Sequence, residues 1–432
     1  DILDIKMKVL IVGGGGREHA LAWKATKSKL VTKVYVAPGN GGTENDDNIQ
    51  NINIPAEDIN KLVDFASKRK IDLTIIGPEV PLVEGITDSF KLKGLKCFGP
   101  SKKASQLEGS KEFMKKFLTK YKIPTAAYRS FEDQKQALDY LNKSSFPVVI
   151  KADGLAAGKG VTVANNSQEA VTAIQECLEH KAFGDAGNKV VIEEFLTGEE
   201  ASFIVLTDGK RAIPLASSQD HKTRDNQDKG PNTGGMGAYS PAPIITKSLH
   251  KEIMDKVIYP TIQGMSKEGI SYQGFLYAGL MIDKDNNIKV LEFNCRFGDP
   301  ETQPILMRLK SDLIELCLQA AEGNLQEQEL DWRSEVALGV VMSSGGYPGS
   351  YENGHQINGL PKETEFLKVF HAGTEVKDNK ILTSGGRVLC VTALGKNTTE
   401  AHKNAYNCVE NIVWKDCFYR TDIGYRAIKR EK

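Results

Sequence analysis

The stretch "LEFNCRFGDPETQ", residues 291–303, carries side chains suited to binding a divalent cation. Glu292 and Asn294 are two residues apart in a strand-like run, so both side chains lie on one face of the strand, and Arg296 continues that face. Carboxylate and amide oxygens are ligands that Mg²⁺ takes in proteins. A strand with polar residues on its solvent side would show the same alternation, but here a glycine and acids follow at once. The stretch therefore predicts a metal site.

The stretch "IKADGLAAGKGV", residues 150–161, is suited to covering the phosphates of a nucleotide. It places Lys151 on a strand, follows it with a loop of glycines and alanines, and adds Lys159 before a second strand. Gly160 stands where a P-loop needs Ser or Thr, so a P-loop is excluded. Taken alone, the stretch is equally consistent with a glycine-rich hairpin whose lysines are merely solvated.

The stretch "GGGG", residues 13–16, lies between a strand-like and a helix-like run. Backbone amides and the helix dipole at such a turn favour an anion. A dinucleotide site would need a glycine at position 18 or 19, but Glu18 and His19 stand there. The turn therefore predicts a simple phosphate site, with a merely tight turn as the alternative.

Residues 220–243, "DHKTRDNQDKGPNTGGMGAYSPAP", form a long polar segment without an apolar period. Such segments are usually functional lids or disordered linkers. Met236, Tyr239 and three prolines argue against a linker, and the glycines would let the backbone approach a ligand closely. We therefore expect an irregular lid over a bound anion.

Strands and helices must alternate in the first hundred residues to position these groups. The apolar runs predict a doubly wound α/β domain with strands at 8–12, 33–40, 51–54 and 72–82 and helices at 17–26 and 58–70.

The middle of the chain follows a different pattern. Helices are expected at 104–120, 132–142 and 302–322, a strand–loop–strand hairpin at 147–164, and antiparallel sheet at 189–208 and 274–297. From residue 336, short strands with one helix near 399–412 predict a small mixed domain.

Composition excludes several classes of function. Lys plus Arg and Asp plus Glu both number 56, so a charged surface for nucleic acid or an anionic membrane is not expected. The seven cysteines include no C-x-x-C pair and suit reduced thiols, and no apolar run approaches the ~20 residues of a membrane span. We expect a cytoplasmic protein, and we leave residues 1–6, which precede a strand-like run starting at Met7, out of the expected fold.

The motifs together resemble the phosphoribosylamine–glycine ligase family of the ATP-grasp superfamily. The resemblance runs through nearly everything after Met7. It rests on "VLIVGGGGREHAL", "GPEVPL", "GSKEFMK", "IKADGLAAGKGV", "GPNTGGMGAYSPAP", "EFNCRFGDPETQ", "VFHAGT", "TSGGRVLCVTALG" and "YRTDIGYRA". It implies an N-terminal α/β substrate-binding domain (7–103), small and large ATP-grasp subdomains (104–190 and 191–328), and a C-terminal domain (329–432).

The resemblance also implies site residues. Magnesium or manganese is expected on Glu292 and Asn294. Three residues are expected to be catalytic: Arg296, Lys151 and Asp220. ATP is expected to contact Lys111, Lys151, Gly158, Lys159, Gly160, Glu193, Glu194, Phe195, Leu196 and Glu200. Glycine and phosphoribosylamine are expected at Gly15, Gly16, Asn40, Pro78, Glu79, Asp220, Asn232, Gly234, Gly235, Arg296 and Asp299.

The reaction implied is the ligation of glycine to 5-phosphoribosylamine with ATP as co-substrate, through a glycyl phosphate, in purine biosynthesis. We expect a monomer that acts on small molecules, without nucleic acid or membrane partners. Three alternatives remain: an ATP-grasp ligase with another acceptor, a nucleotide-binding regulator without turnover, and a dinucleotide oxidoreductase. The glycine spacing opposes the last, and the presence of the lysines and the metal pair opposes the regulator.

Overall fold

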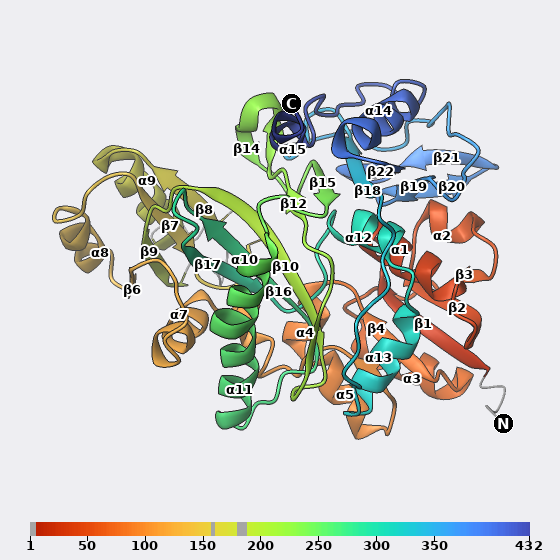
Figure 1. Cartoon of the computed structure of the whole chain (residues 1–432), viewed down its shortest axis with the longest axis horizontal. Helices are drawn as coiled ribbons and strands as arrows, with labels where there is room; N and C mark the ends of the chain where they lie inside the picture. Colours follow the sequence, from red (N-terminus) through yellow and green to blue (C-terminus); the bar gives the residue numbers. More distant parts are fainter. Residues whose placement is uncertain (1–5, 157–159, 179–187) are drawn as a thin grey trace.

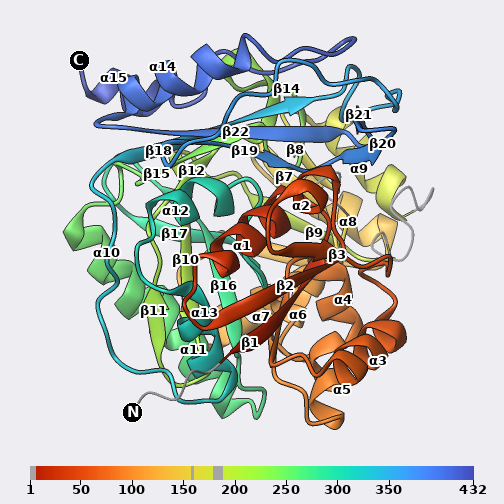
Figure 2. The same ribbon diagram turned by 90° about the vertical axis from the view of Figure 1, so that its right-hand side faces the viewer.

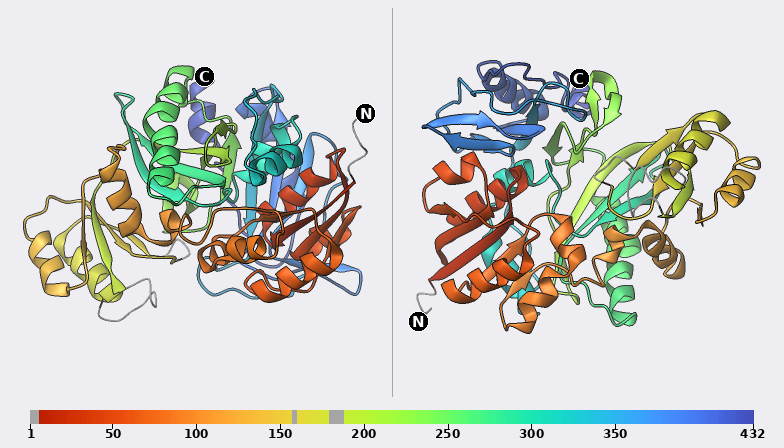
Figure 3. Two further views of the ribbon diagram at one scale, coloured as in Figure 1. Left: turned by 90° about the horizontal axis from the view of Figure 1, so that it is seen from below. Right: turned by 180° about the vertical axis from the view of Figure 1, so that it is seen from behind.

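The computed structural model describes residues 6–156, 160–178 and 188–432. The N-terminal layer and the C-terminal layer lie together at one side, and the ATP-grasp lobes extend to the other (Figures 1 and 3). No helix within the described ranges is long and apolar enough to cross a membrane. The expected N-terminal α/β domain and small mixed C-terminal domain are present, together with antiparallel sheets in the middle of the chain.

The N-terminal sheet is parallel, with strand order β3-β2-β1-β4-β5. Along β1, Val9 and Ile11 belong to one apolar cluster and Leu10 and Val12 to another. Both faces of the strand are buried, which explains its continuous apolar run. The elements are β1 Met7–Gly13, α1 Gly16–Thr26, β2 Val31–Pro38, α2 Gly41–Asn45, β3 Ile49–Asn51, α3 Ile59–Arg69, β4 Leu73–Ile76, α4 Glu79–Glu84, α5 Ile86–Leu92 and β5 Cys97–Phe98.

Two expected strands of this domain were wrong in extent. The strand expected at 51–54 is β3, which ends at Asn51. The strand expected at 72–82 stops at Ile76, because Pro78 has no amide hydrogen to continue the ladder and instead precedes the first turn of α4. Glu79 thereby becomes the first residue of a helix at the carboxyl edge of the sheet.

The ATP-grasp region contains two antiparallel sheets. The small sheet has order β6-β9-β7-β8 and the large one β11-β10-β16-β17. Gly198, at φ 143°, separates β9 from β10 and lets the chain pass from one sheet to the other. The hairpin expected at 147–164 is confirmed. The strands are β6 Tyr128–Phe131, β7 Val148–Ala152, β8 Val161–Ala164, β9 Val190–Glu194, β10 Glu199–Thr207, β11 Ala212–Pro214, β16 Gly274–Ile282 and β17 Ile288–Asn294.

Helices flank these sheets, and two expected helices are divided. Ser110 divides the one expected at 104–120, and its hydroxyl caps the second part. The helix expected at 302–322 breaks because Leu309 is extended, and Asp312 then caps a new helix. The helices are α6 Gln106–Gly109, α7 Lys111–Lys120, α8 Gln134–Leu141, α9 Ser167–Leu178, α10 Lys247–Ile253, the π-helix η3 Met254–Ile258, α11 Tyr259–Lys267, α12 Thr302–Arg308 and α13 Leu313–Ala321.

The C-terminal sheet has order β12-β15-β18-β22-β19 and lies above the N-terminal domain, with α14 on its outer side (Figure 2). The expected single helix near 399–412 is α14, and a second short helix, α15, follows it. The elements are β12 Gln219–Asp220, β15 Gly237–Ser240, β18 Val336–Ser343, β19 Leu367–His371, β20 Thr374–Lys377, β21 Lys380–Thr383, β22 Arg387–Gly395, α14 Thr398–Val409 and α15 Tyr425–Arg430.

The polar segment 220–243 is not irregular, so that expectation was wrong. It forms the hairpin of β13 Thr223–Asp225 and β14 Lys229–Asn232, and then β15 enters the C-terminal sheet beside β18. Met236 and Tyr239 are fully buried there. The buried Arg420 holds the hairpin through Thr223 and Asp228, with a 3.0 Å ion pair to Asp228. The "YRTDIGYRA" motif of the C-terminal domain therefore anchors this segment.

Candidate active site

Two lysines of the small ATP-grasp subdomain meet strand β17 of the large one. Lys111 begins α7, and its Nζ donates to the carbonyl oxygen of Gly154 at 2.6 Å. Lys151 lies on β7, and its Nζ donates to the carbonyl oxygen of Leu291 at 3.4 Å. Both ammonium groups act electrostatically on Glu292, the next residue of β17. The structure thus brings together the lysines and the carboxylate that the sequence predicted for a nucleotide and its metal.

Glu292 has the character of a metal ligand. Burial alone would raise its pKa, but the charges of Lys222, Lys151 and Lys111 outweigh burial and lower the pKa to about 2. The Lys222 Nζ lies 3.6 Å from the Glu292 carboxylate, so a cation is already favoured at this point. Asn294, on the same strand, accepts a hydrogen bond from Arg296 at 3.4 Å.

The donor set, one carboxylate and one amide oxygen, suits a hard divalent cation rather than a metal that prefers nitrogen or sulfur ligands. No cluster of three or more His, Cys, Asp or Glu side chains suited to a metal occurs in the described part of the chain. Mg²⁺ commonly binds one or two protein oxygens and completes its shell with phosphates and water, so the Glu292 and Asn294 oxygens suffice.

Lys222 was missed at the sequence level, although it stands in the polar segment beside Asp220. Its Nζ forms a 3.0 Å ion pair with Glu200 besides facing Glu292. Burial would lower its pKa, but Glu200, Asp220 and Glu292 together raise it well above the usual value. Arg224, a few residues on, pairs with its neighbour Asp225 and does not enter this cluster.

Glu301 is a second residue that sequence reasoning missed. It is 2% exposed, and no hydrogen bond or ion pair to its carboxylate is found among the described residues. A β-carbon at Gly298 would lie 1.5 Å from the Glu301 Oε2, so position 298 must be glycine for the Glu301 carboxylate to lie where it does. Burial and then the neighbouring Asp220 raise the pKa of Glu301, and burial likewise raises the pKa of Asp220. The only hint in the sequence was the acid at 301 in "GDPETQ".

Arg296 connects β17 to the N-terminal domain. Its Nε donates to the Glu79 carboxylate at 3.0 Å, and its Nη2 lies 3.5 Å from the Glu108 carboxylate. Burial would raise the pKa of Glu79, but Arg296 and Arg17 lower it to about 2. The predicted catalytic arginine is therefore held between two carboxylates.

The predicted N-terminal substrate residues lie where helices begin at the carboxyl edge of the parallel sheet. Gly15 and Gly16 begin α1, and Pro78 precedes Glu79 at the start of α4. Gly13, at φ 129°, makes the turn, since a β-carbon there would lie 2.1 Å from Glu18. Ligands bind at this edge in open α/β sheets.

Asn40 uses all of its side-chain polar groups within the protein. Its oxygen caps α2 by accepting from Gly42 and Thr43, and its amide donates to the carbonyl oxygens of Gly14 at 3.0 Å and His371 at 2.7 Å. It therefore fastens the glycine turn to the C-terminal strand β19.

The predicted residues Gly234, Gly235 and Asp299 converge on Arg387 of β22. The Arg387 guanidinium donates to the carbonyl oxygens of Gly234 and Asp299, both at 2.8 Å. Gly235 has φ 120°, and a β-carbon there would lie 2.5 Å from Pro300. The Asp299 carboxylate accepts from the backbone amide of Arg17 at 3.2 Å, so this junction adjoins the start of α1.

The other predicted nucleotide contacts are distributed along β9 and the hairpin. The Glu193 side chain is 3% exposed and lies between two lysines, whereas Glu194 and Phe195 are exposed and Leu196 is half-buried. Gly160 is buried, and Gly158 and Lys159 lie outside the described residues. Asn232 lies at the end of β14, where its side chain is exposed.

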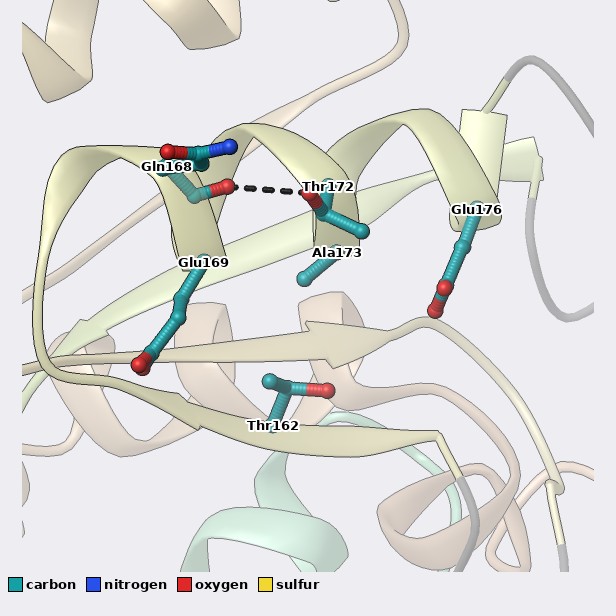
Figure 4. Close-up of a pocket in the computed structure, with 6 residues that line it drawn as sticks. All are labelled: Thr162, Gln168, Glu169, Thr172, Ala173 and Glu176. Atoms are coloured by element: carbon teal, nitrogen blue, oxygen red, sulfur yellow. Dashed lines mark hydrogen bonds between the residues drawn. The ribbon is translucent and has the colours of Figure 1, made fainter.

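A hollow between β8 and α9 lies apart from this set of residues (Figure 4). The side chains drawn there include the carboxylates Glu169 and Glu176 but no lysine, arginine or predicted site residue. Within it, Thr172 donates to the carbonyl oxygen of Gln168 at 3.0 Å. An acidic hollow of this kind does not suit phosphates.

Comparison with known families matches nearly the whole chain. The phosphoribosylglycinamide synthetase N domain matches residues 7–108, its ATP-grasp (A) domain residues 109–302, and its C domain residues 337–426. The phosphoribosylamine–glycine ligase of Escherichia coli (strain K12) is 59% identical over 428 residues, which are 99% of this chain and 100% of that protein.

Solved structures give the same result. The crystal structure of phosphoribosylamine–glycine ligase from Thermotoga maritima has a TM-score of 0.83 at 34% identity and covers 96% of this chain and 100% of that one. The biotin carboxylase domain of 2-oxoglutarate carboxylase from Hydrogenobacter thermophilus, in complex with MgADP and bicarbonate, has a TM-score of 0.73 at 17% identity. It covers 96% of this chain and 91% of its own, and it is similar in fold alone.

Proposed function

The chain belongs to the phosphoribosylglycinamide synthetase family, and from that premise we propose how its residues carry out the family reaction. It is an ATP-dependent carbon–nitrogen ligase that joins glycine to 5-phosphoribosylamine and forms glycinamide ribonucleotide, ADP and phosphate in purine biosynthesis. The proposal concerns the order of the steps and the residues that serve each substrate.

The chemistry of a carboxylate favours two steps. The glycine carboxylate attacks the γ-phosphorus of ATP, ADP leaves, and glycyl phosphate forms. The amine of phosphoribosylamine then attacks the carbonyl carbon, loses a proton, and expels inorganic phosphate. A free carboxylate would have to expel oxide, whereas phosphorylation supplies a good leaving group. Neither step needs a covalent protein nucleophile.

We assign the phosphates of ATP to Lys111 and Lys151 and adenine to the end of β9, from Glu194 to Leu196. The two ammonium groups would neutralise charge as the phosphoryl group moves between oxygens. ATP-grasp ligases generally use a divalent metal. We propose that Mg²⁺, or Mn²⁺, is held by Glu292 and Asn294, where it would neutralise charge on the triphosphate.

We assign the ammonium group of glycine to Asp220 and Glu301. A free amino acid offers one cation and one anion, and the half-buried Asp220 and the buried Glu301, two neighbouring carboxyl groups, suit the cation. The charges of Arg296 and Lys222 act on Glu301, and we assign the reacting carboxylate of glycine to these two cations.

We assign the phosphate of phosphoribosylamine to the start of α1 at Gly15 and Gly16, where backbone amides and the helix dipole favour an anion. Pro78, Glu79 and Asp299 border this point, and Asn40 fastens it. The junction of Gly234 and Gly235 with Arg387 would close the site against water, which would otherwise hydrolyse the acyl phosphate.

Four organisational features also remain proposals: the domain boundaries at 103, 190 and 328, a monomeric state, small molecules as the partners, and a cytoplasmic location. The separate sheets support a division into domains, but the boundary proposed at 190 falls at the start of β9, which pairs with β6 and β7 of the small sheet, and β12 and β15 join the C-terminal sheet. The seven cysteines support a reducing compartment, because all are free thiols.

The convergence of Lys111, Lys151 and Lys222 on Glu292 carries this assignment. The direct test mixes the protein with ATP, glycine, Mg²⁺ and phosphoribosylamine and follows the product by mass. Formation of glycinamide ribonucleotide only when all four are present is expected. Replacement of phosphoribosylamine by other amines tests for a different acceptor, and product from those amines at a higher rate would overturn the assignment.

A further inference from the structure

Lys115 of α7 is a charged side chain in the protein interior. It is 0% exposed, and its Nζ donates to the Thr125 hydroxyl at 2.7 Å and to the Ala126 carbonyl oxygen at 3.3 Å. Burial lowers its pKa to about 8, although Glu193 opposes that shift. An ammonium group is costly to bury unless a negative charge lies near it.

That negative charge is Glu193 of β9, which lies between two lysines. Its Oε1 is 3.2 Å from the Lys115 Nζ, and its Oε2 is 3.0 Å from the Lys151 Nζ. The contact with Lys115 is an ion pair rather than a well-aligned hydrogen bond, since the Glu193 Oε1 has no hydrogen-bond partner among the described residues.

The net charge of Lys115, Glu193 and Lys151 together determines how much positive charge Lys151 presents to a ligand. Without Lys115, Glu193 and Lys151 would form a neutral pair. With Lys115, the three groups carry one net positive charge. Lys115 is enclosed, whereas Lys151 is 8% exposed and reaches Leu291 beside Glu292. The uncompensated charge therefore faces the nucleotide site, in surroundings where the effective dielectric constant is low.

We propose that Lys115 is a positioning residue that supplies the counter-charge for Glu193 and so leaves the Lys151 charge free for the triphosphate of ATP. The inference rests on the proposed assignment of Lys151 to the phosphates. It gives Glu193 a different task from adenine contact, since its carboxylate is occupied by lysines on both sides.

The test compares Lys115→Met with Lys115→Met combined with Glu193→Gln. For each protein, the dissociation constants of a non-hydrolysable ATP analogue and of adenosine are measured, and their ratio is formed. The ratio cancels effects on the adenine pocket. Lys116→Met is the matched control, because Lys116 is next along the same helix and its side chain is 67% exposed.

Lys115→Met should weaken binding of the ATP analogue, relative to binding of adenosine, by about tenfold or more, as expected for one charge lost near a triphosphate. The double variant should regain most of that loss, because removal of the Glu193 charge releases Lys151 again. A purely structural role for Lys115 would lower both affinities together and would not be rescued. Either of those outcomes overturns the proposal.

If Lys115→Met does not fold, Glu193→Gln alone decides the question. It leaves both lysines in place, so the ATP analogue should bind more tightly relative to adenosine than it does to the wild type. An unchanged or weaker relative affinity for the analogue contradicts the proposal. Failure of the proposed function itself would show differently, as wild-type protein that forms no product from the four reactants.

Discussion

The Arg296 guanidinium donates to the Glu79 carboxylate at 3.0 Å and so joins strand β17 to the first turn of α4. Two positions earlier on β17 lies Asn294, and two before that lies Glu292. The strand that carries the candidate metal ligands is therefore fastened to the domain expected to hold phosphoribosylamine. This link places the phosphoryl-transfer chemistry beside the amine that must receive the glycyl group.

Replacement of Arg296 by lysine should weaken the link between strand β17 and the first turn of α4. Lysine keeps the charge but cannot reach Glu79 and Glu108 with one planar fork. We expect kcat/KM for phosphoribosylamine to fall by roughly a hundredfold, the loss of one buried pair. Steady-state kinetics with each substrate varied in turn provides the measurement. Arg333→Lys, at the partly exposed pair with Glu365, is the control and should be neutral.

Glu292→Gln tests the metal assignment. It removes the negative charge that a cation needs and leaves Lys222, Lys151 and Lys111 without their common partner. Turnover should drop by about two orders of magnitude or more with the fold intact, and excess Mg²⁺ should restore part of the rate. Circular dichroism and turnover of the exposed Glu327→Gln are the controls. A wild-type rate in Glu292→Gln would exclude this metal site.

Glu301→Gln tests the ammonium site of glycine. The KM for glycine should rise by roughly ten- to a hundredfold with a smaller change for ATP, because one buried charged contact is lost. The raised pKa values of Glu301 and Asp220 also predict that the KM for glycine rises as the pH falls into their titration range, because protonated carboxyl groups do not hold an ammonium.

The same substitution should stabilise the ligand-free protein at neutral pH. A carboxyl group whose pKa is raised in the folded state adds stability below its unfolded pKa, and that stability is lost as the pH rises through the folded value. Glu301→Gln removes this loss, so its unfolding free energy should exceed that of the wild type by about 1 kcal/mol near neutral pH. Chemical denaturation at acidic and neutral pH measures it. A lower stability than wild type at neutral pH would contradict a raised pKa of Glu301 in the folded protein.

Asn40→Asp tests how the glycine turn is held. Asp can still cap α2, but its second oxygen would face the Gly14 and His371 carbonyl oxygens instead of donating to them. Stability should fall by roughly 1–3 kcal/mol, and the KM for phosphoribosylamine should rise. Asn397→Asp is the matched control, since Asn397 caps α14 through its oxygen and Asp caps equally well. Equal effects of the two substitutions would contradict this role of Asn40.

Local patterns predicted the groups that lie within one element. Glu292 and Asn294 share a face because they are two apart on a strand, and Lys151 follows from a glycine-rich hairpin. Lys222 and Glu301 gain their roles only from residues brought near by the fold, so no spacing identified them. The family resemblance placed Glu193 at the nucleotide as part of residues 193–196, but no pattern in the sequence indicated that its side chain lies between Lys115 and Lys151.

The secondary structure was likewise predicted where it depends on local sequence and missed where it depends on residues far along the chain. Continuous apolar runs predicted the parallel sheet, because both faces of β1 are buried. The polar segment 220–243 could not be read as sheet, because β15 is completed by β18, about a hundred residues later. The break at Leu309 was hidden for a similar reason, since the apolar pattern continues across it and the cap at Asp312 starts a new helix.

A single turnover with glycine labelled with oxygen-18 in its carboxylate tests the central claim most directly. The enzyme, in excess over labelled glycine, is mixed with ATP and phosphoribosylamine, and the released phosphate and the amide product are analysed by mass. Attack of the carboxylate on the γ-phosphorus predicts one labelled oxygen in phosphate and one retained in the amide. Unlabelled phosphate released together with amide product would contradict the glycyl phosphate route.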